Sequence, residues 1–513
     1  MPKAHSFVPP SGPTDASIVF VGEQPGRTEV QRRKPFCGPS GQLLGDLMGS
    51  AGILRTECYF TNVIKDFDAP IKHYVNIKGH NTSVSPAGQT YFDQLKAELE
   101  RIRPNVVVAV GNVALFALTS RTGVTKWRGS VLESTLVRGL KVIPTIHPTT
   151  ILPPKMVYTN RYLIINDLAL ALKQSTSPEI QMSPRTYIIS PTFLESLDYL
   201  DRCIEHGLAD DVVAFDIEIH NMQLSCISFS FKADEAISIP FVGSGGDYFS
   251  PDQEIEVMQK IAELLEDPRI RKLGQNVIFD SSFLLRRYGI KVHSLDDTMI
   301  AQQIIAADFP KGLDFITSMW TDMPYYKDEG KQWFKGLGGR WETLWEYNAR
   351  DSIACSIAFP KQMTELTSKG NLGTYERQRQ LIEPLTFMME HGIRADVKAM
   401  TTAFMNADAD IARLQEELNE TAGMSINPNS PKQLQEYFYN LKRISPYKKG
   451  GRPTTNDDAL KRLARRGFRE ASIIQDIRRV NKQRANYLDP SHVDPDGRIR
   501  CSYNPVGTRY SRI

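Results

Sequence analysis

The sequence predicts a multidomain protein in which two α/β domains precede a mostly α-helical segment. The chain of 513 residues is too long for one domain, because single domains usually contain about 100–200 residues. From 1 to 172, short apolar strands such as "SIVFVGE" alternate with helical stretches such as "YFDQLKAELERI", which is typical of α/β layering. A second α/β pattern runs from 186 to 365, and from 372 onward the apolar spacing is helical.

Four ranges describe the expected domain organisation. The first α/β domain spans 1–175, and the polar, proline-containing stretch "KQSTSPEIQMSPRT" places a linker at 176–186. The second α/β domain spans 187–370, and the helical segment spans 371–513.

The composition is that of an ordinary globular protein, with 41% hydrophobic and 24% charged residues. The six cysteines include no CxxC pair, which argues against a disulfide framework or a cysteine zinc site and fits a reducing compartment. The first residues lack the apolar core of a secretory signal. No apolar stretch is long enough to span a bilayer, so no membrane partner is expected.

Positive charge is concentrated at the end of the chain. Residues 440–513 contain eighteen Lys and Arg against seven Asp and Glu, although the whole chain has a net charge of only +3. A single basic pair usually marks a solvated helix face. A whole segment this unbalanced favours a phosphate-backbone partner.

Acidic residues occur in three places within the second α/β domain. Asp216 and Glu218 lie two apart in an expected strand, so both side chains leave the same face, where they repel each other and lose hydration. Asp280 begins a helical stretch, and Tyr347 and Asp351 lie four apart on one helix face. Mg²⁺ prefers oxygen ligands, and a pair of divalent ions needs several carboxylates. A lone DxE would be weak evidence for metal; the three places together predict a site for two divalent ions, Mg²⁺ or Mn²⁺.

In chain order, "FDIE", "NVIFD" and "YNARD" resemble the tyrosine-type DEDD exonucleases. These are the proofreading domains of family A DNA polymerases, with an RNase H-like fold. The resemblance implies two-metal hydrolysis of the phosphodiester at a DNA 3′ end. Asp216, Glu218 and Asp351 would hold the first metal, and Asp216 would bridge to the second. Asp280 would support the second metal through water, and Tyr347 would orient the attacking water.

Two further residues would touch the substrate by the same resemblance. Asn276 and Met222 fall where the family contacts the terminal nucleotides. Alternatively, Asn276 is a polar residue of a turn and Met222 is a packing residue. "SLDDTMIAQQI" also resembles the family at Asp297 and Thr298.

The helical segment resembles the beginning of a family A polymerase domain. "IEPLTFMMEHGIRAD" matches its opening helix, and "INPNSPKQLQEYFY" matches the thumb. "VDPDGRIRCSYNPVGTRYSRI" matches the entry to the palm, with Arg512 at the arginine of the usual T-G-R-L segment and Tyr510-Ser511 in place of Thr-Gly. The resemblance implies that the thumb grips duplex phosphates beside a primer 3′ end.

By the same resemblance, the palm's metal-binding aspartates and the fingers would follow Ile513. Polymerisation is therefore not expected from this chain alone. A truncated sequence, a split or interrupted gene, and a second polypeptide carrying palm and fingers are the three explanations. The fused arrangement resembles phage polymerases, which implies the cytoplasm of an infected bacterial cell.

The first domain resembles the family 4-type uracil-DNA glycosylases, which have an α/β/α fold. The resemblance covers about 15–172 and is carried by motifs that occur in order: "IVFVGEQPGRTE", "KPFCGPSGQLLGDLM", "YFTNVIK", "VVVAVGNVALFAL", "KWRGS" and "TIHPTTIL". It implies that Phe36 stacks on a flipped uracil and that Asn62 reads the base edge. Glu23 would position or activate water, and His147 would stabilise the departing uracil anion. Considered without the neighbouring motifs, Phe36 would be a core residue and His147 would cap a turn.

Two departures from that family matter. No CxxC precedes "GEQPG", and "TYFDQL" stands where a third cysteine would be, so no iron–sulfur cluster is expected. Gln24 resembles the relatives that capture uracil covalently through a loop histidine. His80 in "NIKGHNTSVSP" lies in such a loop but lacks their basic flanks.

Three functional hypotheses follow. The first is the N-terminal part of a family A DNA-directed DNA polymerase with 3′–5′ proofreading activity and a glycosylase-like domain. The second is a binding protein that reads uracil in DNA or clamps a separate polymerase subunit. The third is an RNA-trimming nuclease with the same acids, against which the thumb-like "INPNSPKQL" argues.

Overall fold

The computed structural model of the chain describes residues 6–78, 81–209, 211–336 and 339–510. The chain forms two compact units, one made of Met1–Thr386 with Asn504–Ile513 and the other of Phe387–Tyr503. Both α/β sheets belong to the first unit, and the domain boundaries expected from the sequence stay a prediction. None of the described helices is long and apolar enough to cross a membrane.

The first sheet has the strand order β2-β1-β5-β7-β6. Its strands are β1 (Ile18–Gly22), β2 (Tyr59–Asn62), β5 (Val106–Val110), β6 (Leu132–Glu133) and β7 (Lys141–Thr145). The four longer strands run parallel, and only β6 is antiparallel to its neighbour. Every residue of those four strands is buried, which explains their continuous apolar runs, because a parallel sheet is covered on both faces.

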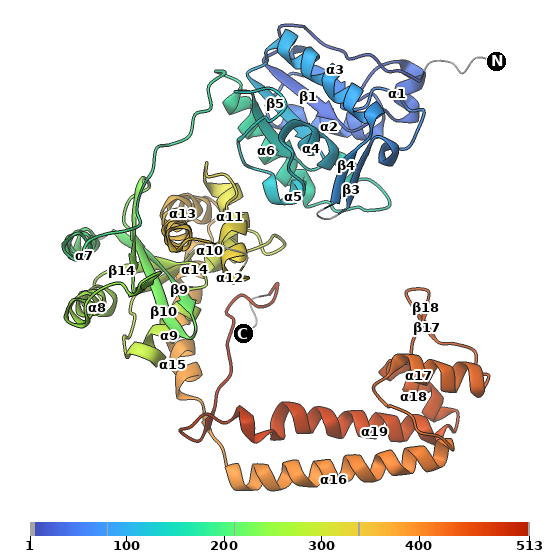
Figure 1. Cartoon of the computed structure of the whole chain (residues 1–513), viewed down its shortest axis with the longest axis vertical. Helices are drawn as coiled ribbons and strands as arrows, with labels where there is room; N and C mark the ends of the chain where they lie inside the picture. The colour runs from blue at the N-terminus through green and yellow to red at the C-terminus, as the bar shows by residue number, and fades with distance from the viewer. Residues whose placement is uncertain (1–5, 79–80, 210, 337–338, 511–513) are drawn as a thin grey trace. The chain divides into compact units, whose positions relative to one another are not determined.

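Helices cover both faces of this sheet (Figure 1). They are α1 (Arg27–Arg32), α2 (Pro39–Ser50), α3 (Pro86–Ile102), α4 (Asn112–Thr119), α5 (Val124–Trp127) and α6 (Asn160–Gln174). Phe20 of β1 packs with Leu44 and Leu168 on the α2 and α6 side. Val21 packs with Leu95 on the α3 side. The expected α/β/α layering is confirmed.

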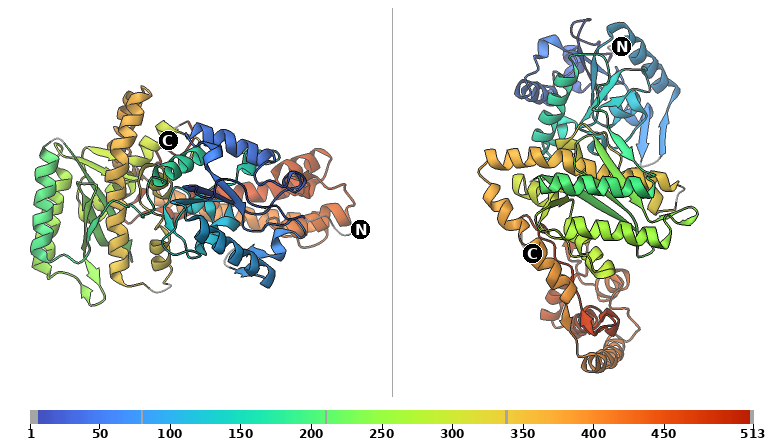
Figure 2. Two further views of the ribbon diagram at one scale, coloured as in Figure 1. Left: turned by 90° about the horizontal axis from the view of Figure 1, so that it is seen from above. Right: turned by 90° about the vertical axis from the view of Figure 1, so that its left-hand side faces the viewer.

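The second sheet has the order β15-β14-β9-β10-β11-β8. Its strands are β8 (Thr186–Ile188), β9 (Val212–His220), β10 (Gln223–Ser230), β11 (Glu235–Pro240), β14 (Arg271–Gly274) and β15 (Leu295–Asp297). The central strand β9 pairs antiparallel with β10 and parallel with β14. Figure 2 shows helices α7 (Phe193–Leu208) and α8 (Pro251–Glu266) on one face and the long helix α13 (Trp341–Ser368) on the other.

The remaining helices of this domain are α9 (Val277–Tyr288), α10 (Thr298–Ile305), α11 (Leu313–Trp320), α12 (Asp328–Phe334), α14 (Leu372–Arg379) and α15 (Ile382–His391). In the first domain β3 (Val75–Lys78) pairs antiparallel with β4 (Asn81–Val84), and in the second domain β12 (Val242–Gly243) pairs antiparallel with β13 (Gly246–Asp247). Residues 504–510 lie against this domain, where Lys311 Nζ donates to the Val506 carbonyl over 2.7 Å.

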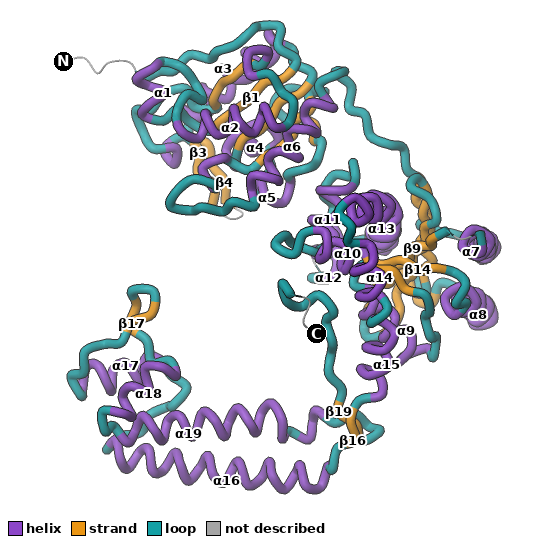
Figure 3. The backbone as a smooth tube through the Cα atoms, turned by 180° about the vertical axis from the view of Figure 1, so that it is seen from behind, coloured by secondary structure: helices purple, strands orange, loops and turns teal. Residues whose placement is uncertain are grey.

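The second unit is mostly helical. Its elements are α16 (Val397–Ala422), α17 (Pro431–Gln435), α18 (Asp457–Arg465), α19 (Arg469–Gln483) and the short strands β16 (Ile393–Arg394), β17 (Lys448–Lys449), β18 (Arg452–Pro453) and β19 (Arg498–Ile499). Helices α16 and α19 lie side by side (Figure 3), and Leu418 and Ile474 share their apolar core. Gly423 ends α16 with φ 71°, a conformation that glycine adopts at little cost.

A buried ion pair ties the end of α5 to α6 in the first domain. Arg128 Nη2 lies 2.6 Å from Asp167 Oδ1, and the two side chains are only 2% and 0% exposed. The Thr145 hydroxyl donates to the other carboxylate oxygen over 2.9 Å. Burial raises the pKa of Asp167, while Arg128 opposes that shift.

We expect Asp167→Ala to destabilise the first domain by about 3–5 kcal/mol, because removing one partner leaves the other charge buried and unpaired. The measurement is calorimetric thermal unfolding of the full chain, in which the transition of this domain should move to lower temperature. Asp93→Ala, at an exposed carboxylate on α3, is the matched control. Equal unfolding midpoints for the two variants would contradict the expectation.

Candidate active sites

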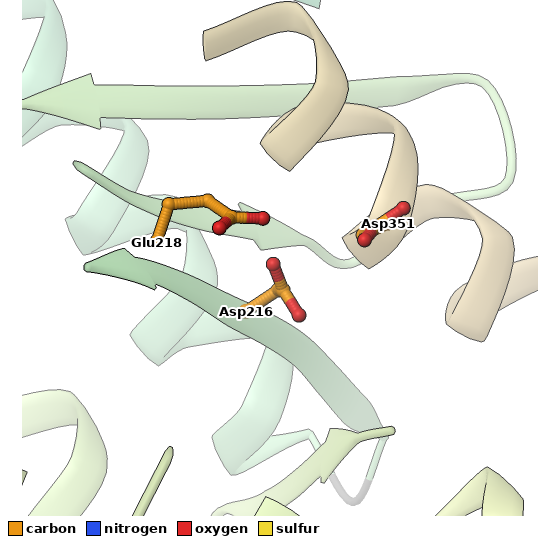
Figure 4. A group of neighbouring side chains, drawn as sticks. All are labelled: Asp216, Glu218 and Asp351. Atoms are coloured by element: carbon orange, nitrogen blue, oxygen red, sulfur yellow. The ribbon is translucent and has the colours of Figure 1, made fainter. Parts of the chain in front are cut away.

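Three carboxylates converge at the centre of the second sheet. Strand β9 directs Asp216 and Glu218 to the same face, and helix α13 brings Asp351 opposite them (Figure 4). One oxygen from each residue lies within 4.8 Å of the others. A strand alternates its side chains between faces, so the two-residue spacing in "DIE" is what aims both carboxylates at the helix.

The electrostatics of this cluster favour protons or a cation. Burial raises the pKa of Glu218 to about 8, and the Asp351 carboxylate adds to the shift. Burial also raises the pKa of Asp216 well above its ordinary value, with further contributions from Asp351, Asp280 and Glu218. Carboxylates held close enough to repel one another are a donor set that suits a divalent cation, so the residues present fit the expected metal.

Asp280 lies beside the three carboxylates rather than among them. It belongs to α9, and its Oδ1 accepts the backbone N–H of Ile217 over 3.2 Å, between the two acids of β9. Burial raises the pKa of Asp280 to about 8, against the lowering effect of that hydrogen bond. The structure therefore brings all four predicted acids into one region, with Asp280 on the side of Asp216.

The two predicted nucleotide contacts occupy strained turns. Met222 follows the end of β9, with φ 62° and 74% of its surface exposed. Asn276 precedes α9 with φ 59°. Asp297 holds that second turn, because its carboxylate accepts the N–H groups of Asn276 and Val277 over 3.1 and 3.0 Å. Left-handed backbone at non-glycine residues often marks functional sites.

Sequence reasoning missed three residues of this site. Asn348 donates from Nδ2 to Asp216 Oδ2 over 2.9 Å. The Tyr326 hydroxyl donates to Asp351 Oδ1 over 2.6 Å, and Lys327 Nζ pairs with Asp351 Oδ2. Asn348 stands inside "YNARD", but its partner is 132 positions away; "PYYKDEG" carries no signal of its own.

Tyr347 is positioned by the same lysine. Lys327 Nζ lies 2.8 Å from the Tyr347 hydroxyl. Burial raises the pKa of Tyr347, and the nearby Asp351 carboxylate adds to the shift. The phenol is therefore neutral near pH 7, and it acts through its hydrogen bonds.

A second group of predicted residues gathers at one edge of the first sheet. Glu23 follows β1, Asn62 ends β2, and His147 follows β7. The carboxyl ends of parallel strands meet at the same edge, where ligands bind in open α/β sheets. Gly22 lies under this group, since a methyl there would come 2.3 Å from Asn62 Oδ1 and 2.8 Å from Phe36 Cζ.

Phe36 has a strained backbone and a buried ring. Its φ is 52°, and only 7% of its surface is exposed. Arg55 Nη2 donates to the Phe36 carbonyl over 2.7 Å, which holds the turn. The ring packs against Gly22, and its centroid lies 5.5 Å from that of Phe60; its stacking on a base stays a prediction.

The protonation state of His147 follows from its contacts. The Thr149 backbone N–H donates to His147 Nδ1 over 3.2 Å, so the neutral ring carries its proton on Nε2. Burial lowers the pKa of His147 to about 4, and the positive charge of Lys155 adds to the shift. Burial raises the pKa of Glu23, while Lys155 opposes that shift. The edge thus holds a neutral donor and a buried acid.

Three other residues that the sequence singled out are Gln24, His80 and Arg512. The Gln24 amide donates to the carbonyls of Asp66 and Ala69 over 2.9 and 2.7 Å, which fastens a loop of the first domain. His80 and Arg512 lie outside the described residues.

Comparison with known proteins divides the chain into three matched regions. Residues 9–168 match the uracil DNA glycosylase superfamily, 191–363 match the 3′-5′ exonuclease of family A DNA polymerases, and 397–513 match DNA polymerase family A. These regions define a class of protein in which a base-recognition fold is joined to a proofreading fold.

Individual relatives agree with this division. A type-4 uracil-DNA glycosylase of Thermotoga maritima is 37% identical over 28% of this chain and 69% of that protein. The DNA polymerase of Bacillus phage SP01 is 22% identical over 98% of this chain and 62% of that protein. DNA polymerase I of Rhizobium leguminosarum is 28% identical over 62% of this chain, but the match spans only 35% of that polymerase. The first domain belongs to the type-4 uracil-DNA glycosylases, and the remainder of the chain is similar to family A DNA polymerases.

Protons and metal should compete for the acidic cluster. Glu218 and Asp280 carry protons up to about pH 8 without metal, so an ion must displace them. We expect Mn²⁺ affinity, measured by titration calorimetry, to rise with pH by roughly tenfold per unit for each proton released and to level off above about pH 8. Glu218→Gln should reduce the number of protons released. An affinity that does not change between pH 6 and 9 would contradict this competition.

Proposed function

We propose that the chain removes nucleotides from the 3′ end of DNA, as the N-terminal part of a replicative family A DNA polymerase. The observation that carries this proposal is the convergence of Asp216, Glu218 and Asp351 within 4.8 Å in the region that matches the 3′-5′ exonuclease family. An RNA-trimming role is less well supported, since residues 397–513 match a DNA polymerase family.

Each acid has a distinct task in this proposal. Asp216, Glu218 and Asp351 would hold one Mg²⁺ or Mn²⁺, and Asp280 stands where it would support a second. A divalent ion supplies a Lewis acid and neutralises charge on the phosphate. Asn348 keeps the Asp216 carboxylate turned toward the cluster by donating to it over 2.9 Å.

Tyr347 would orient the attacking water. Its neutral hydroxyl is held by Lys327 at one helical turn from Asp351, so a water placed between them would meet both a hydrogen-bonding phenol and a carboxylate. The exposed Met222 and the turn at Asn276 are the residues proposed to meet the terminal nucleotides.

The basic second unit is the proposed grip on duplex DNA. Lysines and arginines are enriched in 440–513, and phosphate contacts of this kind position a duplex without reading its sequence. Replication inside a phage-infected bacterial cell remains a prediction, which the similarity to the Bacillus phage polymerase supports.

Asp216→Ala combined with Glu218→Ala should reduce exonuclease activity to background, because two ligands of the proposed metal are lost. The measurement is gel analysis of 5′-labelled single-stranded DNA with Mg²⁺ or EDTA, in which the wild-type chain should give a metal-dependent ladder from the 3′ end. Asp252→Ala with Glu256→Ala, at two exposed acids of α8, is the matched control and should keep the ladder. A ladder of normal intensity from the first double variant would contradict the proposal.

A second function is favoured by the edge of the first sheet, where Asn62 and Phe36 both approach Gly22. We propose that this edge receives a uracil extruded from DNA, read by the Asn62 amide. The neutral His147 would donate its Nε2 proton to the anion that develops on the departing base. A pure reading role would use Asn62 and Phe36 but not His147.

Asn62→Ala should weaken binding to uracil-containing DNA by about 1–3 kcal/mol, the usual contribution of a bidentate contact to a base. Band shifts against an otherwise identical thymine-containing strand measure this, and chromatography detects free uracil. His147→Asn should keep binding and lose uracil release if the domain is catalytic. Binding by the wild-type chain without release would favour the reading role, and equal affinity for the two strands would contradict both.

A further inference from the structure

The motif "KWRGS", residues 126–130, faces the exonuclease domain. Both belong to the first compact unit of the chain. Arg128 Nη1 donates to the Ser318 hydroxyl over 3.0 Å. Gly129 approaches the backbone so closely that a methyl there would lie 2.4 Å from the Ser318 carbonyl oxygen. Arg128 and Gly129 of the motif are therefore packed against α11.

Two residues of this motif hold a loop of the exonuclease domain. We name residues 321–327, which lead from α11 into α12, the bridging loop. Lys126 Nζ forms an ion pair with Oδ2 of Asp328, the first residue of α12, and lies 4.9 Å above the Tyr325 ring. The Trp127 ring packs edge-on against Tyr325, with 5.2 Å between centroids. The Tyr325 hydroxyl closes the cluster by donating to Asp328 Oδ1 over 3.1 Å.

Tyr326 and Lys327 lie between Tyr325 and Asp328 in the sequence, and their side chains contact the acidic cluster instead. Tyr326 is 5% exposed and donates to Asp351 Oδ1 over 2.6 Å. Lys327 Nζ pairs with Asp351 Oδ2 and donates to the Tyr347 hydroxyl over 2.8 Å. Both oxygens of one predicted metal ligand, and the hydroxyl that would orient water, are thus held by the bridging loop.

Asp351 needs such a restraint. Its carboxylate faces those of Asp216 and Glu218 at short range, and like charges in a buried site repel. A loop without regular structure keeps a defined shape only where its side chains are anchored. Here the anchors on one side are Lys126 and Trp127, which belong to the other domain.

We propose that the glycosylase-like domain is a structural part of the exonuclease site, and that Lys126 and Trp127 are positioning residues for it. They fix the bridging loop, and through it Tyr326 and Lys327 orient Asp351 and Tyr347. This inference rests on the proposed exonuclease function. It makes proofreading dependent on a surface of the first domain that takes no part in uracil recognition.

Charge exchange in the full-length chain tests the inference. Lys126→Glu should break the ion pair and loosen the loop, because residues that orient metal ligands typically contribute about 10–100-fold to metal affinity or activity. We expect kcat for hydrolysis of single-stranded DNA to fall about tenfold or more, and Mn²⁺ affinity measured by calorimetry without DNA to fall about tenfold. The dissociation constant for single-stranded DNA in Ca²⁺ should stay within about twofold of wild type, because the loop orients Asp351 and Tyr347 rather than the nucleotide contacts.

The double variant Lys126→Glu with Asp328→Lys restores a pair of opposite sign and should recover most of kcat and of Mn²⁺ affinity. Lys96→Glu, at an exposed lysine of α3 that lies 3.9 Å from Glu100, makes the same charge change and should behave as wild type. Trp127→Ala should reproduce the defect of Lys126→Glu without any change of charge. Only variants whose unfolding temperature, measured by calorimetry, equals that of the wild-type chain are compared.

Two outcomes would overturn the inference. Lys126→Glu and Trp127→Ala could match Lys96→Glu in kcat and Mn²⁺ affinity, or the exchanged double variant could remain as slow as Lys126→Glu. If instead the wild-type chain shows no hydrolysis with any metal, the proposed exonuclease function fails first. Mn²⁺ binding without hydrolysis separates that result from a failure of the inference alone.

Discussion

Repulsion between buried carboxylates is the constraint around which the exonuclease domain is arranged. Asp216 and Glu218 share one face of the central strand, and Asp351 of α13 lies opposite them. Two of them, Asp216 and Asp351, are restrained by donors from different parts of the fold. Asn348 donates to Asp216 from α13, and Lys327 reaches Asp351 from the bridging loop. The fold thus keeps together groups that would separate in water, and this is the condition for binding a divalent cation tightly.

The candidate site of the first domain also lies on a β-sheet, but its physical requirement is different. Among the described residues this predicted site has no cluster of carboxylates, and the His147 ring is neutral because burial lowers its pKa. Phe36 and Asn62 both approach Gly22 so closely that a side chain there would not fit. The parallel strand order brings residues from separate motifs to one edge, because the carboxyl ends of parallel strands coincide.

The contact between the two domains gives the fusion a physical meaning. Segments of the first domain that match the glycosylase superfamily include the motif at 126–130, yet this motif packs on the exonuclease domain through Ser318 and Tyr325. Both domains belong to the same compact unit of the chain, so the contacts at this motif link the two candidate sites physically.

The sequence by itself determined the fold class, the order of the domains and the acids of the candidate metal site. Alternation in "DIE", the four-residue spacing of Tyr347 and Asp351, and the apolar parallel strands are local patterns, and local patterns follow from the geometry of strands and helices. These features could be predicted because each depends on neighbours within a few positions.

Only the tertiary structure decided which residues restrain those acids. Asn348 meets Asp216 across 132 positions, and Lys126 meets Asp328 across 202. The role of Tyr326 and Lys327 depends on which side of a loop faces α13, and neither periodicity nor spacing encodes that. The physical reason is that hydrogen bonds and ion pairs between distant segments are set by how the sheets and helices pack, which one chain's residue pattern does not record.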